Sequence, residues 1–259
     1  MITNRKIYLM QRLQQAVVKG AATRYVVVES ETREQAEKLL KKFALVYDTE
    51  LTKSTKTRRR QAGEATTTAH CYERPERSEQ PRYWIILMVS DGVGRIEQFE
   101  KLVAVTNTNR RIQLDGYELI HDGIKWSWRM AKPTYQYWEK RIRTVCALPP
   151  ERRKPQDVER LIADLAKVPG FRLARRQVGN LYTLLKREWK RLRPSTDVLP
   201  PTPTYLPYVR MLAKGPGKVM VDPGSKRSAR DGDAEMMTDA LPLDSTAGQS
   251  CQTKQRGLS

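Results

Sequence analysis

The sequence predicts an α+β protein: a mixed or antiparallel sheet domain, then a basic helix-turn-helix-like module, and finally a disordered C-terminal tail. Three observations predict this organisation. Strand-type apolar runs alternate with helical patterns through residues 1–150, residues 151–193 carry helical patterns only, and residues 222–259 have no apolar periodicity. The intervening segment 194–221 is rich in proline, so we expect an extended arm there.

The strand signals all fall within the first domain. We expect strands over 24–30, 66–73 and 82–90, and the last is apolar on both faces, which favours a central position in the sheet. Residues 110–130 contain Asp-Gly at 115–116 and again at 122–123. Because Asp-Gly favours tight hairpins, this stretch predicts three strands joined by two turns.

Helical patterns lie between the strands. Apolar residues at helical spacing predict helices over 3–19, 31–43, 96–103 and 134–147. Residues 44–50 either extend the second helix or begin a strand. The stretch 51–65 is polar and basic, and we expect it to be a mobile loop.

Composition excludes several classes of protein. The three cysteines, Cys71, Cys146 and Cys251, form no CxxC pair, which argues against a zinc ribbon or a disulfide framework and favours free thiols in a reducing cytoplasm. No stretch approaches the roughly 20 apolar residues that a membrane span needs. Charged residues interrupt the first 20 positions, so no signal peptide is expected. We therefore expect a cytoplasmic protein without a membrane partner.

The net charge points to a polyanionic partner. The chain has 48 Lys and Arg against 29 Asp and Glu, a formal charge of +19. The predicted tail 222–259 is slightly acidic, so the excess belongs to the folded part. Because neutralising phosphates releases counterions, nucleic acid is the expected partner. An anionic membrane surface is the alternative, but no lipidation motif accompanies the charge.

The basic module predicts a helix-turn-helix. One helix is expected over 156–168, and a longer one begins near 173–175 and continues to 193. Arginine pairs with guanine, and glutamine or asparagine pairs with adenine. Near the start of the second helix, the candidate base-reading residues are Arg175, Arg176, Gln177 and Asn180. Further along the helix, the candidate nucleic-acid contacts are Thr183, Arg187, Lys190 and Arg191.

An ordinary solvated helix pair closing a bundle is the simpler alternative for this module. Local charge argues against it, because residues 140–193 hold sixteen basic residues and five acidic ones, a net charge of +11. A surface without a charged partner mixes the two signs more evenly. Contact with nucleic acid is thus the favoured interpretation of the module. Reading of bases in a DNA groove is a more specific form of the same hypothesis.

Signals for catalysis are weak. A metal-dependent nuclease would combine a His-x-His strand with a helical tyrosine, and the candidates are His70, Tyr135 and Tyr137. The second metal ligand is missing, so buried structural roles are the preferred interpretation. No metal site or cofactor is expected, since the sequence holds neither a metal-ligand cluster nor a nucleotide-binding loop.

The function that the sequence favours is DNA binding in the replication, transfer or regulation of a plasmid or mobile element. One alternative is an RNA-binding or metal-independent RNA-processing protein, because a compact α+β domain with His, Tyr and basic residues is similar to the endonucleases that process CRISPR RNA. This chain lacks the glycine-rich C-terminal loop of that family. A non-enzymatic assembly subunit that binds an acidic protein is the other alternative.

Overall fold

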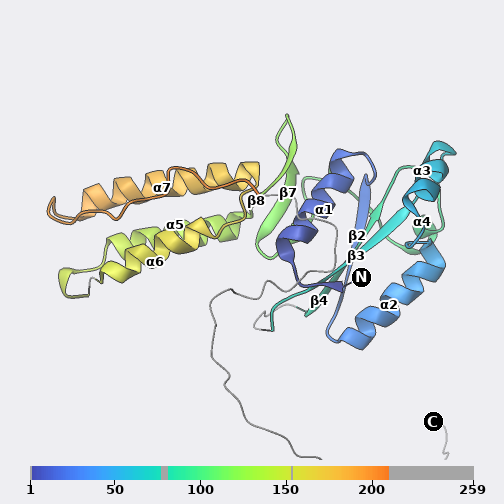
Figure 1. The fold of residues 1–259 in the computed structure, drawn as a ribbon, viewed down its shortest axis with the longest axis horizontal. Helices are drawn as coiled ribbons and strands as arrows, with labels where there is room; N and C mark the ends of the chain where they lie inside the picture. Colours follow the sequence, from blue (N-terminus) through green and yellow to red (C-terminus); the bar gives the residue numbers. More distant parts are fainter. Residues whose placement is uncertain (1, 77–80, 153, 210–259) are drawn as a thin grey trace, which may run out of the picture. The chain divides into compact units, whose positions relative to one another are not determined.

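The computed structural model of the chain describes residues 2–76, 81–152 and 154–209, and it confirms the α+β class (Figure 1). The chain divides into two units, and the described residues all belong to the first, Met1–Ala213. The second unit and the predicted disordered tail 222–259 lie outside the described residues. Among the described helices, none combines the length and the apolar character that crossing a bilayer requires.

The larger sheet has five strands in the order β1-β3-β4-β2-β5. In that order the strands are Ile2–Thr3, Thr67–Glu73, Tyr83–Val89, Arg24–Ser30 and Val103–Ala104. The short β1 pairs parallel with β3, and the other neighbours are antiparallel. The predicted central strand is confirmed: β4 lies in the middle, and every residue of it is buried.

β4 is apolar on both faces because each face packs against a different helix. Trp84, Ile86 and Met88 belong to the core that includes helix α1 (Lys6–Val18). Ile85 and Leu87 belong to a second core that includes helix α2 (Arg33–Tyr47). Since strand side chains alternate, the continuous apolar run fills two cores at once.

The polar segment 51–65 is not the mobile loop that we expected, because Lys53–Gln61 forms helix α3. The Thr52 side chain caps its first turn by accepting a hydrogen bond from the Thr55 backbone. Lys56 is buried, and its Nζ donates to the Thr49 carbonyl (2.7 Å) and the Thr68 hydroxyl (3.0 Å). The sequence pattern missed this helix because a lysine, not an apolar residue, faces the sheet.

The other elements of the first domain follow the predictions with small changes. The undecided residues 44–47 extend α2, and the helix expected over 96–103 is only one turn, α4 (Ile96–Phe99). The three strands expected within 110–130 form a second sheet. They are β6 (Gln113–Leu114), β7 (Tyr117–His121) and β8 (Trp126–Met130).

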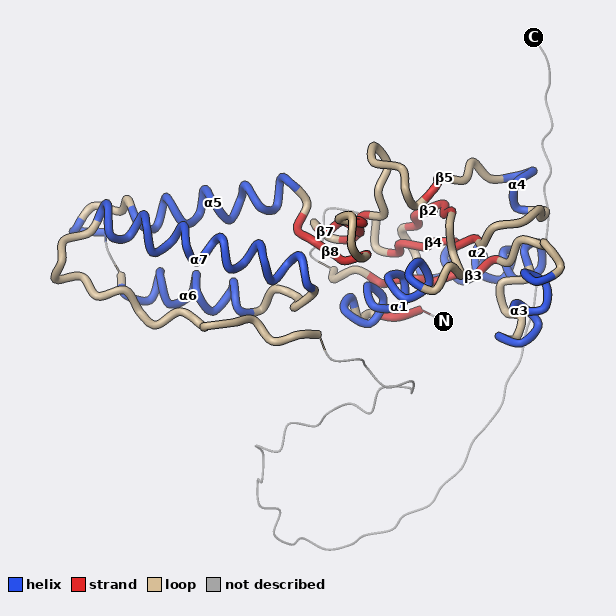
Figure 2. Tube along the Cα trace, turned by 90° about the horizontal axis from the view of Figure 1, so that it is seen from above, coloured by secondary structure: helices blue, strands red, loops and turns tan. Residues whose placement is uncertain are grey.

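Three helices follow β8 and lie side by side in Figures 1 and 2. They are α5 (Lys132–Cys146), α6 (Pro155–Ala166) and α7 (Arg172–Leu192), with a short 3-10 turn, η1 (Pro150–Arg152), before α6. The start of α7 lies beside Met130 and its end beside Val145, so α5 and α7 run in the same direction. Buried residues of α6 and α7 join the same core as Trp128 and α1, so the helices and the sheets share one interior.

Residues 194–209 of the predicted proline-rich arm form no helix or strand and return along α7, and residues 210–221 lie outside the described residues. Trp189 at the end of α7 donates its indole N–H to the Asp197 carbonyl (2.9 Å). Leu206 is buried, and the Val209 amide donates to Gly170, just before α7 (3.3 Å). We call residues 194–209 the arm. A Cβ added at Gly170 would overlap the Pro207 carbonyl oxygen, so the close approach of the arm requires glycine there.

Candidate nucleic-acid interface

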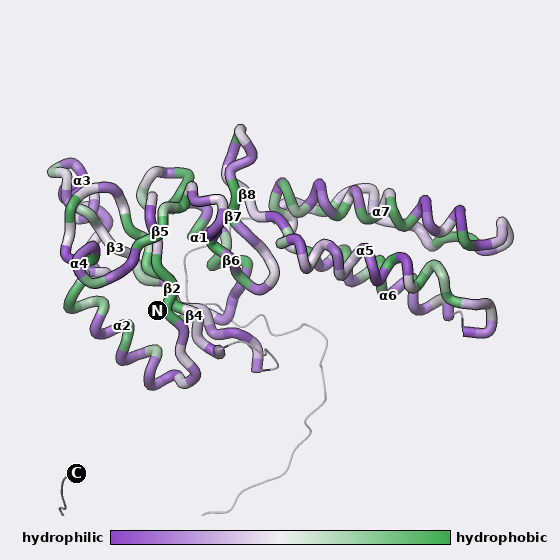
Figure 3. The backbone as a smooth tube through the Cα atoms, turned by 180° about the vertical axis from the view of Figure 1, so that it is seen from behind, coloured by the Kyte–Doolittle hydropathy of each residue, from purple (hydrophilic) through white to green (hydrophobic). Residues whose placement is uncertain are grey.

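Helix α7 has one buried face and one solvent face, and Figure 3 shows hydrophobic and hydrophilic residues alternating along it. Val178, Leu181 and Leu185 are almost completely buried. Because a helix repeats every 3.6 residues, a second set of positions lies on the side of α7 opposite these three residues. We call this the outer face; all five of its residues are exposed, namely Arg176, Asn180, Thr183, Arg187 and Lys190.

The outer face contains positive charge without an intramolecular partner. Within the described part of the chain, the side chains of Arg176 and Lys190 form no ion pair or hydrogen bond. Arg187 lies 3.6 Å from Glu188, but its side chain is 70% exposed. Solvated charges of this kind are available to neutralise phosphates.

Three of the predicted contact residues are instead engaged with the protein. Gln177 fixes the end of β8, since its side-chain oxygen accepts from the Met130 amide (2.6 Å) and its nitrogen donates to the Met130 carbonyl (3.1 Å). Arg175 donates to the Leu206 carbonyl of the arm. Arg191 is bound to Glu188 at 2.6 Å. In this conformation Arg175 and Gln177 are therefore not free to read base edges.

The packing of α6 and α7 also bears on the predicted helix-turn-helix. In such a unit the two helices cross steeply, at about 90–120°. Here α6 and α7 run alongside one another, and the Tyr182 hydroxyl donates to the Ile162 carbonyl at 3.3 Å (Figures 1 and 2). α6 and α7 therefore form a helical hairpin that packs against α5. Groove reading by α7 stays a prediction.

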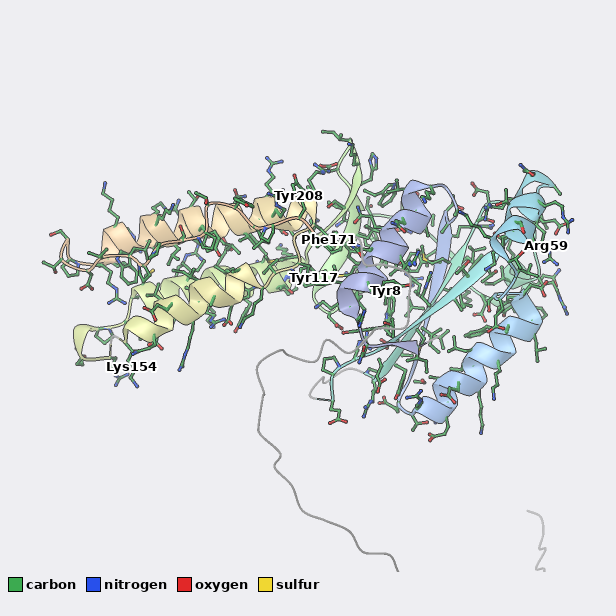
Figure 4. All side chains as sticks on the ribbon, in the orientation of Figure 1. Tyr8, Arg59, Tyr117, Lys154, Phe171 and Tyr208 are labelled. Atoms are coloured by element: carbon green, nitrogen blue, oxygen red, sulfur yellow. The ribbon has the colours of Figure 1, made fainter. Side chains whose placement is uncertain are left out.

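A basic and aromatic groove lies between the first turns of α7 and the end of the arm. It encloses about 280 Å³. Its charged side chains are Arg172, Arg175 and Arg176, and its aromatic ones include Tyr205 and Tyr208. Figure 4 shows Tyr208 beside the end of α7 where Phe171 begins the helix. We call this site the arm groove.

Contacts within the arm groove fix two of its three arginines. Arg172 binds Asp122 at 2.6 Å, and this hydrogen bond holds the pKa of the Asp122 carboxyl well below its usual range. The Arg175 guanidinium stacks on the Tyr208 ring, 3.5 Å from its centroid. Arg176 remains in solvent with its charge unpaired among the described residues.

The weak catalytic candidates do not form a site. His70 lies on β3, whereas Tyr135 and Tyr137 lie on α5. Burial, with the nearby charges of Lys56 and Arg12, lowers the pKa of His70 to about 4, so its imidazole is neutral and weakly basic at pH 7. Tyr137 packs edge-on against Trp138 but is 58% exposed, so the buried role expected for it is wrong. In residues 2–76, 81–152 and 154–209, no group of His, Cys, Asp or Glu is arranged to hold a metal ion.

Trp128 on β8 is a buried aromatic residue. Its side chain has no exposed surface, and its indole N–H donates to the Met10 carbonyl at 2.8 Å. Trp128 therefore belongs to the core and does not stack on bases.

Sequence reasoning missed the arm side of the site. Tyr205 and Tyr208 lie in the run PTPTYLPY, which was interpreted only as a proline-rich extension. Two tyrosines in such a stiff segment are a visible signal, but their position beside Arg175 depends on how the arm folds back. Comparison of the chain with family models, with curated proteins and with solved structures gives no match.

Proposed function

We propose that this protein binds nucleic acid through the outer face of α7, and that duplex DNA is the preferred form. The observation that supports the proposal is the unpaired positive charge of this face. Arg176 and Lys190 are fourteen residues apart, a span of about 21 Å on a helix with a rise of about 1.5 Å per residue. That span reaches several phosphates along a duplex, since each strand carries one about every 3.4 Å.

The charge of α7 is larger than solubility demands. The helix holds seven basic residues and one acidic residue, Glu188, for a net charge of +6. Glu188 is buried beneath Arg187 and Arg191 and does not screen Arg176, three turns away. Clustered charge of one sign repels itself, and a polyanion relieves that repulsion.

The mode of binding that best fits these contacts is attachment to the phosphate backbone. Arg175 and Gln177 already have protein partners, so the exposed cations provide most of the contacts. Backbone contacts give affinity that falls steeply with salt and carries little sequence information. A role in the replication, transfer or regulation of a plasmid or mobile element remains a prediction from the sequence.

The test is a titration of fluorescent duplex DNA, single-stranded DNA and a structured RNA at about 50 mM and about 200 mM salt. We expect duplex DNA to bind most tightly at the lower salt and to lose affinity at the higher one. Tighter binding of the RNA would overturn the preference for DNA. No binding of any probe at low salt would overturn the proposal itself.

A matched pair of variants locates the site. Arg176→Ala with Lys190→Ala removes two cations from α7, and we expect the salt slope to fall by about 2. Lys38→Ala with Lys41→Ala removes two exposed cations from α2 and serves as the control. Equal losses in the two variants would show that net charge, and not the outer face, is responsible.

A further inference from the structure

The arm groove has a chemistry that the duplex contacts do not use. Its lining combines three arginines with the exposed rings of Tyr205 and Tyr208, whereas contact with the phosphates of a duplex requires only cations. Tyr205 and Tyr208 are 69% and 65% exposed although the arm around them is packed on α7. Exposed aromatic rings beside cations are the elements with which proteins hold unpaired bases.

The arm holds these rings in place before any ligand arrives. Leu206, between the two tyrosines, is buried, and its carbonyl accepts a hydrogen bond from Arg175. Prolines at 203 and 207 restrict the backbone on both sides. The ring of Tyr208 is further fixed by Arg175 stacked on it. Little ordering of the arm is thus needed when a ligand binds, which favours affinity.

A glycine in α7 indicates that the groove is kept open. Gly179 lies in the interior of the helix, where glycine is about 1 kcal/mol less favourable than alanine, and it lines the arm groove. A Cβ at this position would meet no atom within 4 Å, so packing within the described protein does not require glycine. Because Gly179 has no side chain, the surface of α7 at this position is accessible to a ligand.

From these contacts we infer that the arm groove binds an unpaired nucleotide of DNA. The base stacks on the exposed tyrosine rings over Gly179, and Arg176 contacts its phosphate. The volume of about 280 Å³ lies just below the range of about 300–1,000 Å³ of small-ligand pockets, which suits one nucleotide and not a longer segment. The inference rests on the proposed function and narrows it: the preferred substrate is a duplex that carries a single-stranded extension.

The experiment compares a blunt duplex with the same duplex extended by a single-stranded tail of about six nucleotides. We expect the wild-type protein to bind the tailed duplex about 10-fold more tightly. Equal affinities would overturn the inference and leave the proposed function intact, because the blunt duplex would still bind. Failure to bind either probe would overturn the proposed function.

Variants show whether the groove is responsible. Tyr205→Ala with Tyr208→Ala should reduce the affinity for the tailed duplex to that for the blunt one and leave the blunt duplex unchanged. Tyr137→Ala, which removes an exposed tyrosine from α5, should retain the 10-fold difference. Tyr208→Phe keeps the ring and should also retain it. A tail preference that survives loss of both arm tyrosines would contradict the inference.

Gly179→Leu separates binding from stability. The leucine fills the groove but improves the helix propensity of α7, so the melting temperature should not fall. We expect the tail preference to disappear in a protein at least as stable as the wild type. Retention of the preference would place the unpaired nucleotide elsewhere.

Discussion

Helices α2 and α7 are both amphipathic surface helices of similar build, but their charges are arranged differently. Helix α2 holds four basic and two acidic residues, a net charge of +2 in 15 residues. α7 has a net charge of +6 in 21 residues. On α2, Arg33 pairs with Glu37 at 2.9 Å, whereas Arg176 of α7 has no such carboxylate among the described residues. α7 therefore has the larger excess of positive charge.

Several arginines in and near the sheets are paired with carboxylates, as Arg33 of α2 is. Arg74 is buried, and it is neutralised by Glu29 (3.0 Å) and Asp115 (3.3 Å). Arg111 and Arg129 share Glu118. Arginines in this part of the molecule are used to join strands and loops, so part of the high arginine content is structural. A count of basic residues alone cannot distinguish them from the arginines of the outer face.

Charge reversal should give the largest difference between the two helices. Arg176→Glu with Lys190→Glu is expected to weaken duplex binding by more than about 100-fold, because attraction to phosphate becomes repulsion. Lys38→Glu with Lys42→Glu on α2 should weaken it only several-fold, through net charge. The measurement is anisotropy at low salt, with circular dichroism to verify that both proteins are folded. Similar losses would remove the distinction between the helices.

The buried faces of the two helices should respond alike. Leu181→Ala on α7 and Phe43→Ala on α2 each remove a side chain with almost no exposed surface. Each should lower the free energy of unfolding by about 3 kcal/mol, since both leave a cavity in a packed core. Urea denaturation measures the effect. If only one substitution destabilised the protein, the two helices would differ in their interiors as well as in their solvent faces.

Protonation of His70 on β3, in contrast to the exposed cations of α7, should make the stability of the protein depend on pH. The pKa of His70 is about 4 when folded and about 6.5 in an unfolded chain, so between these values the unfolded state binds the additional proton. The contribution of neutral His70 to the free energy of unfolding is therefore fully present above pH 6.5 and is lost as the pH falls toward 4. At pH 5 we expect a loss of about 2 kcal/mol relative to pH 7.

His70→Gln isolates this effect because its side chain does not titrate. The variant should lose about 2 kcal/mol less than the wild type when urea denaturation is repeated at pH 7 and pH 5. Identical pH profiles would show that His70 is protonated as easily in the folded protein as in the unfolded one. DNA binding at pH 7 should be unchanged, because His70 is not on α7.

Loosening the arm should have the smallest effect on stability. No extended segment of this kind is described along α2. Gly170→Ala forces the arm away from the Pro207 contact, and exposure of Leu206 should lower the free energy of unfolding by about 1 kcal/mol. Chymotrypsin should then cleave faster after Tyr205 and Tyr208. Gly179→Ala, which has space for its methyl group, is the control and should not change cleavage. Unchanged cleavage of the Gly170→Ala protein would show that the arm does not depend on this contact.

The sequence by itself determined the class of the fold and most of its elements. The apolar run 82–90 predicted a buried central strand, and the Asp-Gly pairs predicted the hairpins, because these signals are local in the chain. The two faces of α7 were equally local, since both follow from a repeat of 3.6 residues. The imbalance of charge in α7 was likewise visible without a structure.

Only the tertiary structure decided which basic residues remain free and what surrounds them. Arg175, Arg176 and Gln177 are adjacent in the sequence, but one stacks under the arm, one lies in solvent and one fixes β8. Helix α3 escaped prediction because a buried lysine bonded to Thr49 and Thr68 takes the place of an apolar residue. Each of these outcomes depends on contacts between segments far apart in the chain, and periodicity within one segment contains no information about its partners.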